Sequence, residues 1–299
     1  MPPIALLLLL LVPLAGTALL QLVPSERSGL VRPLAVAGAL LQLLLVLLCW
    51  RLPPPDLLQP WLPKLGLDLN LGLDGLSQPM VLLTSLITAL AILATPVDQP
   101  RPRLFFSLLL ATNLGAMGAF LARNALLFVL AFELVLIPTT LLVAIWGGQK
   151  RAGAAIRFLL YGAVSGLSLL AGVLALGWLN RNGLSFAYAD LAKASLSPQA
   201  TRWVLALLLV GFGLKLPVVP LHGWQPFTYG QAPIPVVMIL AGAVSKLGAY
   251  GLLRFGVGFL PETWIAWSSW IAAAGAITAV YGALNAIVQD DMRRLMAYS

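Results

Sequence analysis

Three ionisable side chains lie well inside hydrophobic stretches of this chain, and their types suit the transfer of protons. Glu133 lies in LLFVLAFELVLIP, Lys215 in LLLVGFGLKLP and Lys246 in ILAGAVSKLGAYG. A charged group at the centre of a bilayer costs roughly 2.5–3.5 kcal/mol on insertion scales, so it usually faces a protein interior or a wet cavity and marks an ion pathway. One alternative is an ion pair that fixes helix packing. The other is a lysine that reaches the membrane surface, which suits Lys215 better than Lys246 because Lys246 has apolar runs on both sides.

A carboxylate close to a lysine would control the proton of that lysine in such a site. A nearby Glu133 favours the charged form of Lys215, and withdrawal of the carboxylate lets desolvation favour the neutral amine. A Glu133–Lys215 pair that opens and closes would therefore load and release a proton. Lys246 could take that proton through a bridging water. We expect no catalytic residue for a covalent reaction.

Prolines interrupt the hydrophobic run that contains Lys215. Pro217 and Pro220 lack a backbone N–H, so we expect the helix to break there and to free carbonyl groups that bind water. His222 follows the break and is the one histidine of the chain. Because histidine titrates near neutrality, His222 could relay a proton. The alternative is a histidine at the membrane interface that is hydrogen-bonded to the backbone.

The composition is that of an all-α polytopic membrane protein. Hydrophobic residues make up 60% of the chain, charged residues 9%, and the mean hydropathy is +0.95. A soluble domain could not cover its surface with so few polar groups. The single cysteine, Cys49, excludes a disulfide framework and a cysteine-ligated cluster within the chain, and the single histidine excludes a multi-histidine metal site. We therefore expect no cofactor and no metal bound by this chain, and the net charge of +8 suits anionic lipid rather than nucleic acid.

Hydropathy predicts about nine membrane spans, each of roughly 20 apolar residues. They are 4–23, 33–50, 79–96, 105–122, 125–146, 157–179, 202–221, 233–253 and 264–287. Positive charges are slightly more frequent in the loops on the side opposite the N-terminus, which predicts an N-terminus outside the cytoplasm. The last residues, QDDMRRLMAYS, look like a loop that leads into a further helix, so we expect an N-terminal fragment of a longer protein.

The connecting segments carry three local predictions. Alternation from Leu65 to Leu73 predicts a short extracytoplasmic hairpin, and the small and polar residues of 180–198 predict a short helix on the membrane surface. Asp74 is expected to cap the third helix or its approach, and the alternative is a direct role in proton transfer. Arg123 and Asn124 are expected to have structural roles in a tight turn between spans.

Six motifs in order resemble one family of membrane proteins. LGLDGLS, FELVLIP, LYGAVSGL, GFGLKLPVVPLHGWQP, ILAGAVSKLGAYGLLR and QDDMRRLMAYS together resemble the antiporter-like membrane subunits of respiratory complex I. The resemblance covers nearly the whole chain and is strongest to the chain 4 (subunit M) family of NAD(P)H–quinone oxidoreductase. The pattern WGGQKR is most similar to the cyanobacterial and plastid branch.

The resemblance implies a fold with two inverted five-helix repeats, each with a broken helix. The first repeat would occupy 104–254, after N-terminal helices and an extracytoplasmic loop in 1–103, and 255–299 would begin a truncated second repeat. Glu133, Lys215, Lys246 and His222 match the charged residues of the family's proton path. The family usually has an acid, a histidine and a second acid where this chain has Phe227, Tyr229 and Gln231, so proton passage toward that membrane face is expected to differ.

By resemblance, the chain is a proton-translocating membrane-arm subunit of a redox-driven quinone oxidoreductase, a translocase with no redox centre in this chain. NAD(P)H or ferredoxin and quinone would act elsewhere in the complex. Its partners would be other membrane-arm subunits and the lipid bilayer, in a bacterial inner membrane or a cyanobacterial thylakoid membrane. One alternative is a subunit of a multi-subunit cation/proton antiporter, and another is a scaffold subunit that no longer transports.

Overall fold

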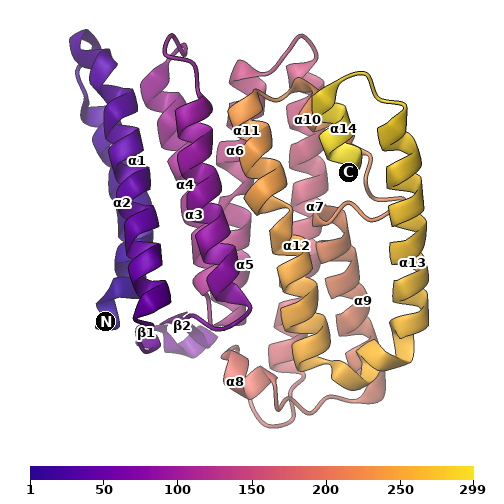
Figure 1. Ribbon diagram of the computed structural model, residues 1–299. Helices are drawn as coiled ribbons and strands as arrows, with labels where there is room; N and C mark the ends of the chain where they lie inside the picture. Colours follow the sequence, from indigo (N-terminus) through magenta and orange to yellow (C-terminus); the bar gives the residue numbers. More distant parts are fainter.

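The computed structural model describes residues 1–299 as a bundle of long, roughly parallel helices (Figure 1). Eight helices are long and apolar enough to cross a membrane, which confirms the all-α polytopic class. They are α1 Ile4–Leu22, α2 Val31–Arg51 with the preceding 3-10 turn η1 Ser25–Leu30, α3 Ser77–Ala94, α4 Pro102–Leu121, α5 Ala125–Leu134 continued by α6 Leu136–Trp146, α7 Arg151–Trp178, the composite helix Ile234–Val257, and α13 Pro261–Ile287.

The span predicted at 202–221 is not one continuous helix. α9 Pro198–Lys215 begins before the predicted start and ends well before the predicted end, and the short helix α10 Trp224–Gln231 follows an irregular segment. Pro217 and Pro220 in that segment have no N–H to donate, so the helical ladder cannot continue through them. The chain therefore has eight continuous candidate spans and one discontinuous one.

α4 lies at the centre of the N-terminal part of the bundle, where it is mostly buried and packs against α1, α3 and α5. Gly115 makes this possible, because a Cβ there would lie only 2.9 Å from the carbonyl oxygen of Ala131. Helices in lipid have no hydrophobic force between them and rely on such close backbone contact. Gly115 therefore sets the distance between α4 and the helix that carries Glu133.

Buried amide side chains also join α4 to the first three helices. Asn113 donates through Nδ2 to Oε1 of Gln42 at 2.6 Å, and Gln42 donates through Nε2 to the carbonyl oxygen of Leu9 at 3.0 Å. Thr88 donates to Oδ1 of Asn113 at 3.2 Å. An unpaired polar group in this environment would be costly, so the network favours one arrangement of these helices over others.

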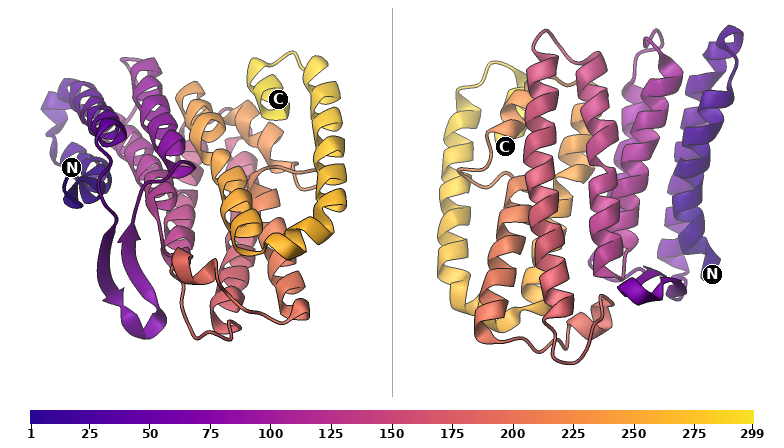
Figure 2. Two further views of the ribbon diagram at one scale, coloured as in Figure 1. Left: turned by 60° about the horizontal axis from the view of Figure 1, so that its bottom comes forward. Right: turned by 180° about the vertical axis from the view of Figure 1, so that it is seen from behind.

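The predicted hairpin exists, but it starts earlier than predicted. β1 Leu57–Leu62 pairs antiparallel with β2 Leu67–Leu71 through the turn η2 Pro63–Leu65, and the hairpin projects from one end of the bundle (Figure 2). The first strand, LLQPWL, does not alternate and contains Pro60, and neither feature predicts a strand. A two-stranded ribbon tolerates proline because both of its strands are edge strands.

The surface helix predicted in 180–198 is much shorter than expected. Only α8 Tyr188–Leu191 is helical there. The rest is a loop whose ends are held together by Asn180, which accepts hydrogen bonds through Oδ1 from the backbone N–H groups of Asn182 and Ser195 at 3.2 and 3.0 Å. Asparagine competes with helical hydrogen bonding in this way.

The C-terminal part of the chain has two further features. The composite helix consists of α11 Ile234–Ile239, the π-turn η3 Leu240–Val244, α12 Lys246–Gly251 and the π-turn η4 Leu252–Val257. α13 has no buried residue, and the final helix α14 Met292–Tyr298 packs against α10 and α13. The division into 1–103, 104–254 and 255–299 stays a prediction.

Asp74 holds three separate segments together at the end of the bundle where the N-terminus lies. Its Oδ1 accepts the N–H groups of Leu76 and Ser77, which confirms its predicted capping role at the approach to α3. Its Oδ2 also lies 2.8 Å from Arg123, in the α4–α5 turn, and 2.5 Å from Arg254, in η4. Burial alone would raise the pKa of Asp74, but the hydrogen bonds from Ser77 and Arg254 and the charges of both arginines lower that pKa to about 2.

We expect Asp74→Asn to lower the free energy of unfolding by about 1–2 kcal/mol near neutral pH. Because the pKa of Asp74 is lowered to about 2 in the folded protein, its stabilising effect is present above the unfolded pKa of about 4 and is lost as the pH falls toward about 2. The measurement is the thermal unfolding midpoint of both proteins in detergent as a function of pH. Asp68→Asn, in the hairpin, is the matched control because Asp68 forms no ion pair; a difference that persists at acidic pH would contradict the assignment.

Candidate functional site

The candidate site surrounds the interruption between α9 and α10. The backbone of this segment is largely satisfied without a helix: the indole of Trp224 donates to the carbonyl oxygen of Leu214 at 2.8 Å, and the N–H of Val219 donates to Oγ1 of Thr278 in α13 at 3.1 Å. Irregular backbone at membrane depth is tolerated only where protein or a wet cavity satisfies its polar groups. The interruption is therefore a stable part of the fold, and the hydrogen bond from Val219 to Thr278 connects it with α13.

Lys215 is the last residue of α9 and is only 4% exposed. Its Nζ lies 4.8 Å from the ring centre of Phe132 and 5.7 Å from that of Phe158. No carboxylate oxygen lies within 4.0 Å of it. The alternative in which Lys215 reaches the membrane surface is wrong, because the side chain points into the bundle between two aromatic faces, which attract a cation.

A very small cavity borders Lys215. It has a volume of about 10 Å³ and is lined by Tyr161, Ser165 and Trp224 among others. This volume is close to the smallest that holds one water molecule. Ser165 itself donates to the carbonyl oxygen of Gly211 at 2.7 Å, which fixes α7 against α9 beside the cavity.

Glu133 lies near the end of α5, directly before the point where α5 gives way to α6. Pro138 cannot donate to the carbonyl oxygen of Leu134, which accounts for the interruption. The carboxyl group packs so closely on Gly166 of α7 that a Cβ at that position would overlap it. Glu133 and Lys215 are thus on neighbouring helices but do not form an ion pair, and the opening and closing of this pair stays a prediction.

Lys246 begins α12, directly after the π-turn η3. In this turn the N–H of Ser245 donates to Leu240, five residues back, instead of to Ala241. The freed carbonyl oxygen of Ala241 accepts from Nζ of Lys246 at 2.6 Å and from Oγ of Ser245 at 2.8 Å. Such single π-turns are frequent at functional sites, and here the turn fixes the ammonium near the middle of the composite helix.

His222 and Lys246 line one cavity of about 730 Å³. The imidazole of His222 packs edge-on against Tyr281 of α13 at 4.8 Å between ring centres, and its Nδ1 is buried without a hydrogen-bond partner. The alternative in which backbone hydrogen bonds hold the histidine is therefore not found. Lys215 does not line this cavity, although the next residue, Leu216, does.

The structure therefore arranges the four predicted residues as two neighbouring groups. Lys246 and His222 line the larger cavity together with Leu216, whereas Glu133 and Lys215 do not line it. Sequence reasoning missed the aromatic neighbours of Lys215 and the contribution of α13, namely Thr278 and Tyr281. Phe and Tyr in apolar spans carry no signal that separates a site from ordinary packing.

The three residues that depart from the family pattern are held by local contacts. Phe227 lies 4.2 Å below the guanidinium of Arg157. Tyr229 is fully buried and its hydroxyl has no partner. Gln231 accepts through Oε1 from the N–H of Lys150 at 2.9 Å. Phe227 and Gln231 thereby attach α10 to the α6–α7 region at the end of the bundle opposite the N-terminus.

The spans define a polytopic membrane protein, and a discontinuous helix with a buried charged residue is a feature found in many transport proteins. The chain belongs to the family described as NADH:quinone oxidoreductase/Mrp antiporter, TM, which matches residues 122–299. The resemblance found in the sequence motifs is confirmed at the level of this family, and the chain is an integral membrane protein.

Relatives and solved structures agree with this assignment. The chain is 40% identical over 299 residues to NAD(P)H-quinone oxidoreductase chain 4 of Synechococcus sp. (strain WH7803), covering 97% of this chain and 54% of the relative. It is similar to a chain of respiratory complex I from Thermus thermophilus, with a TM-score of 0.88, 32% identity and coverage of 98% of this chain and 61% of that one. It is also similar to the Mrp complex from Dietzia sp. DQ12-45-1b, with a TM-score of 0.83, 25% identity and coverage of 98% and 32%. The chain spans about half the length of the curated relatives it matches.

We expect Gly166→Ala to displace the carboxyl group of Glu133, because the added Cβ overlaps it. Overpacking of this kind costs about 1–3 kcal/mol. The measurement is the thermal unfolding midpoint in detergent. Gly153→Ala is the matched control on the same helix, since a Cβ there makes only ordinary contact with Phe227. The double variant Gly166→Ala/Glu133→Ala should recover most of the loss; no recovery would mean that the clash is with something other than the carboxyl group.

Proposed function

We propose that this chain is a proton-translocating membrane-arm subunit of a redox-driven NAD(P)H- or ferredoxin-dependent quinone oxidoreductase. The observation that carries the proposal is Lys215, a buried amine at a helix break with no carboxylate within 4.0 Å. Such a charge is expensive to bury and is retained where it has a function. The names of the chain 4 relatives and the likeness to a complex I chain support the redox-driven reading.

The proposed cycle uses the two groups of residues in turn. When Glu133 approaches Lys215, the ion pair favours the protonated amine. When Glu133 withdraws from Lys215, desolvation favours release of the proton; the packing of its carboxyl group on Gly166 supports this part of the proposal. Water at the Pro217–Pro220 break then carries the proton past Leu216 to Lys246 and His222, which face the larger cavity.

The remaining parts of the proposal concern the assembly. Electrons would pass between NAD(P)H or ferredoxin and a quinone in other subunits, with no redox group in this chain. Conformational change transmitted from those subunits would move Glu133 relative to Lys215. The chain would work beside other membrane-arm subunits in a bacterial inner membrane or a cyanobacterial thylakoid membrane.

We expect Lys215→Ala in the full-length protein to abolish redox-driven proton uptake while the complex still assembles, because the relay loses its central proton carrier. The measurement is proton uptake into sealed vesicles that contain the assembled complex, with electron donor and quinone supplied and sodium absent. Lys64→Ala, at the exposed hairpin turn, is the matched control. Normal uptake by a fully assembled Lys215→Ala complex would refute the role of Lys215.

A cation/proton antiporter subunit is the second candidate. The family description names the Mrp antiporter, and a chain of the Mrp complex has a similar fold. Glu133→Gln distinguishes the two functions. In a redox-driven subunit, we expect the substitution to collapse proton uptake under electron flow without sodium or potassium. If wild type moves protons only under an imposed sodium or potassium gradient, the antiporter function is correct. If both proteins support equal uptake under electron flow, the chain is a scaffold.

A further inference from the structure

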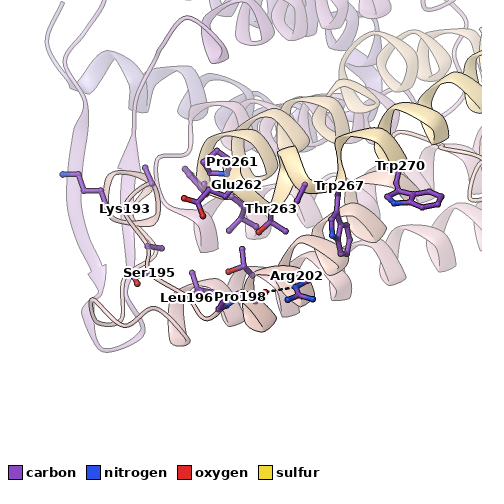
Figure 3. A pocket seen from close by; sticks show the side chains of 16 residues that line it. Lys193, Ser195, Leu196, Pro198, Arg202, Pro261, Glu262, Thr263, Trp267 and Trp270 are labelled. Atoms are coloured by element: carbon purple, nitrogen blue, oxygen red, sulfur yellow. Dashed lines mark hydrogen bonds between the residues drawn. The ribbon is translucent and has the colours of Figure 1, made fainter.

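The cavities of this chain differ in their relation to Lys215. The largest has a volume of about 1150 Å³ and lies between the loop that precedes α9 and the beginning of α13 (Figure 3), and none of the four residues of the proposed relay lines it. The cavity of about 10 Å³ beside Lys215 is lined by α7, α9 and α10 alone. Its lining residues are Phe158, Tyr161, Gly162, Ser165, Leu214, Lys215 and Trp224. A proton that leaves Lys215 through this cavity therefore meets only groups of these three helices.

The walls of this small cavity belong to the interior of the bundle. Phe158, Ser165 and Trp224 are 2%, 1% and 3% exposed, and Lys215 is 4% exposed. Phe158, Tyr161 and Ser165 lie on one face of α7, because residues three and four apart are neighbours on a helix. The volume is close to the smallest that holds one water molecule. Any polar group that faces this space is therefore within one bridging water of the ammonium group.

Three side chains in the lining besides the lysine carry a polar hydrogen, and two of them are already used. Oγ of Ser165 donates to the carbonyl oxygen of Gly211 at 2.7 Å, and the indole of Trp224 donates to that of Leu214 at 2.8 Å. Neither group can pass its hydrogen on without breaking that bond, and an indole N–H cannot accept a proton. The hydroxyl of Tyr161 has no hydrogen-bond partner in the chain. It is therefore the one group of the lining that is free both to accept a proton and to donate one.

Tyr161 also reaches the segment that follows the helix break. Its hydroxyl oxygen lies 3.6 Å from the position that a Cβ on Gly223 would occupy, and Gly223 directly follows His222. His222 in turn lines the larger cavity together with Lys246. The phenol therefore connects the cavity of Lys215 with the segment that carries His222.

We propose that Tyr161 is a further residue of the proton relay, and that its phenol passes protons from Lys215 to the helix break. This inference rests on the proposed function. An N–H bond of the Lys215 ammonium breaks and its proton bonds to the phenol oxygen, directly or through one water. The O–H bond of the phenol breaks at the same time, and its proton passes to water at the Pro217–Pro220 break. The phenol is neutral before and after the transfer, the amine becomes neutral, and no electron moves.

The test is redox-driven proton uptake into sealed vesicles that contain the assembled complex with the full-length protein, measured in H₂O and in D₂O. Tyr161→Phe removes the hydroxyl and keeps the ring. We expect uptake to fall roughly tenfold to a hundredfold, toward the lower end of what a positioned acid–base group contributes, because water can take over part of the transfer. The solvent isotope effect should rise, since proton transfer becomes the slow step.

Tyr188→Phe is the matched control. The hydroxyl of Tyr188 is also buried without a partner, but Tyr188 does not line the cavity of Lys215. We expect this variant to show the uptake and the isotope effect of wild type. An equal fall in Tyr188→Phe and Tyr161→Phe would reveal a general effect of removing a buried hydroxyl and would overturn the proposal.

Replacement of Tyr161 by 3-fluorotyrosine gives a second measurement that keeps the hydroxyl and nearly the same ring size. The fluorinated phenol is more acidic, and the rate of proton transfer depends on the acidity of the transferring group, so uptake should change by roughly twofold or more. A tyrosine that only packs would give the rate of wild type. If Tyr161→Phe does not assemble, the result with 3-fluorotyrosine decides alone.

Lys215→Ala, measured in the same vesicles, separates this inference from the proposed function. Wild-type uptake with both changes at Tyr161, together with loss of uptake in Lys215→Ala, would overturn the role of Tyr161 and leave the proposed function intact. Normal uptake by an assembled Lys215→Ala complex would refute the proposed function and the role of Tyr161 with it.

Discussion

The burial of a cationic amine in a medium of low dielectric constant is the constraint on which the rest of this structure depends. Lys215 is almost fully enclosed, its ammonium group lies beside the faces of Phe132 and Phe158, and no carboxylate oxygen lies within 4.0 Å of it. The helix ends at this residue, so its last carbonyl groups are no longer used by a regular ladder. Trp224 and Thr278 satisfy part of the interrupted backbone. Burying the charge of Lys215 costs free energy. The end of α9, the two aromatic rings and the contact with α13 together make that burial possible.

The helices around Lys215 must keep their positions for this arrangement to persist. Two groups of polar side chains hold them, one at an end of the bundle and one at membrane depth. Asp74 fixes the positions of α3, the α4–α5 turn and η4 at one end through its two arginine partners. The amide network of Gln42 and Asn113 fixes the N-terminal helices at membrane depth. Gly115 and Gly166 then let neighbouring helices approach closely around Glu133. The frame around the carboxyl group of Glu133 is thus held by hydrogen bonds and close packing.

The sequence predicted which segments span the membrane, but it predicted less well the direction in which their side chains point. Hydropathy located eight spans and the class of the protein, and the prolines indicated where α9 would be interrupted. It left open whether Lys215 points inward or reaches the membrane surface, because the hydropathy of a segment does not determine where one side chain points. Nor did it reveal that Asp74 collects Arg123 and Arg254, since their pairing depends on contacts between segments far apart in the chain. The short α8 and the first strand of the hairpin depend on the Asn180 loop and on edge pairing, which are tertiary effects.

The two lysines differ in what holds them once their charge is gone. An ammonium group has three N–H donors, and a neutral amine keeps two of them and gains a lone pair. The bond from Lys246 to the Ala241 carbonyl therefore survives deprotonation, and this side chain keeps its place through a cycle of proton binding and release. Lys215 is held by the attraction between a cation and two aromatic faces, and that attraction vanishes with the proton. Lys246 therefore keeps its hydrogen bond in both protonation states, whereas Lys215 loses the attraction of the two aromatic rings when it is neutral.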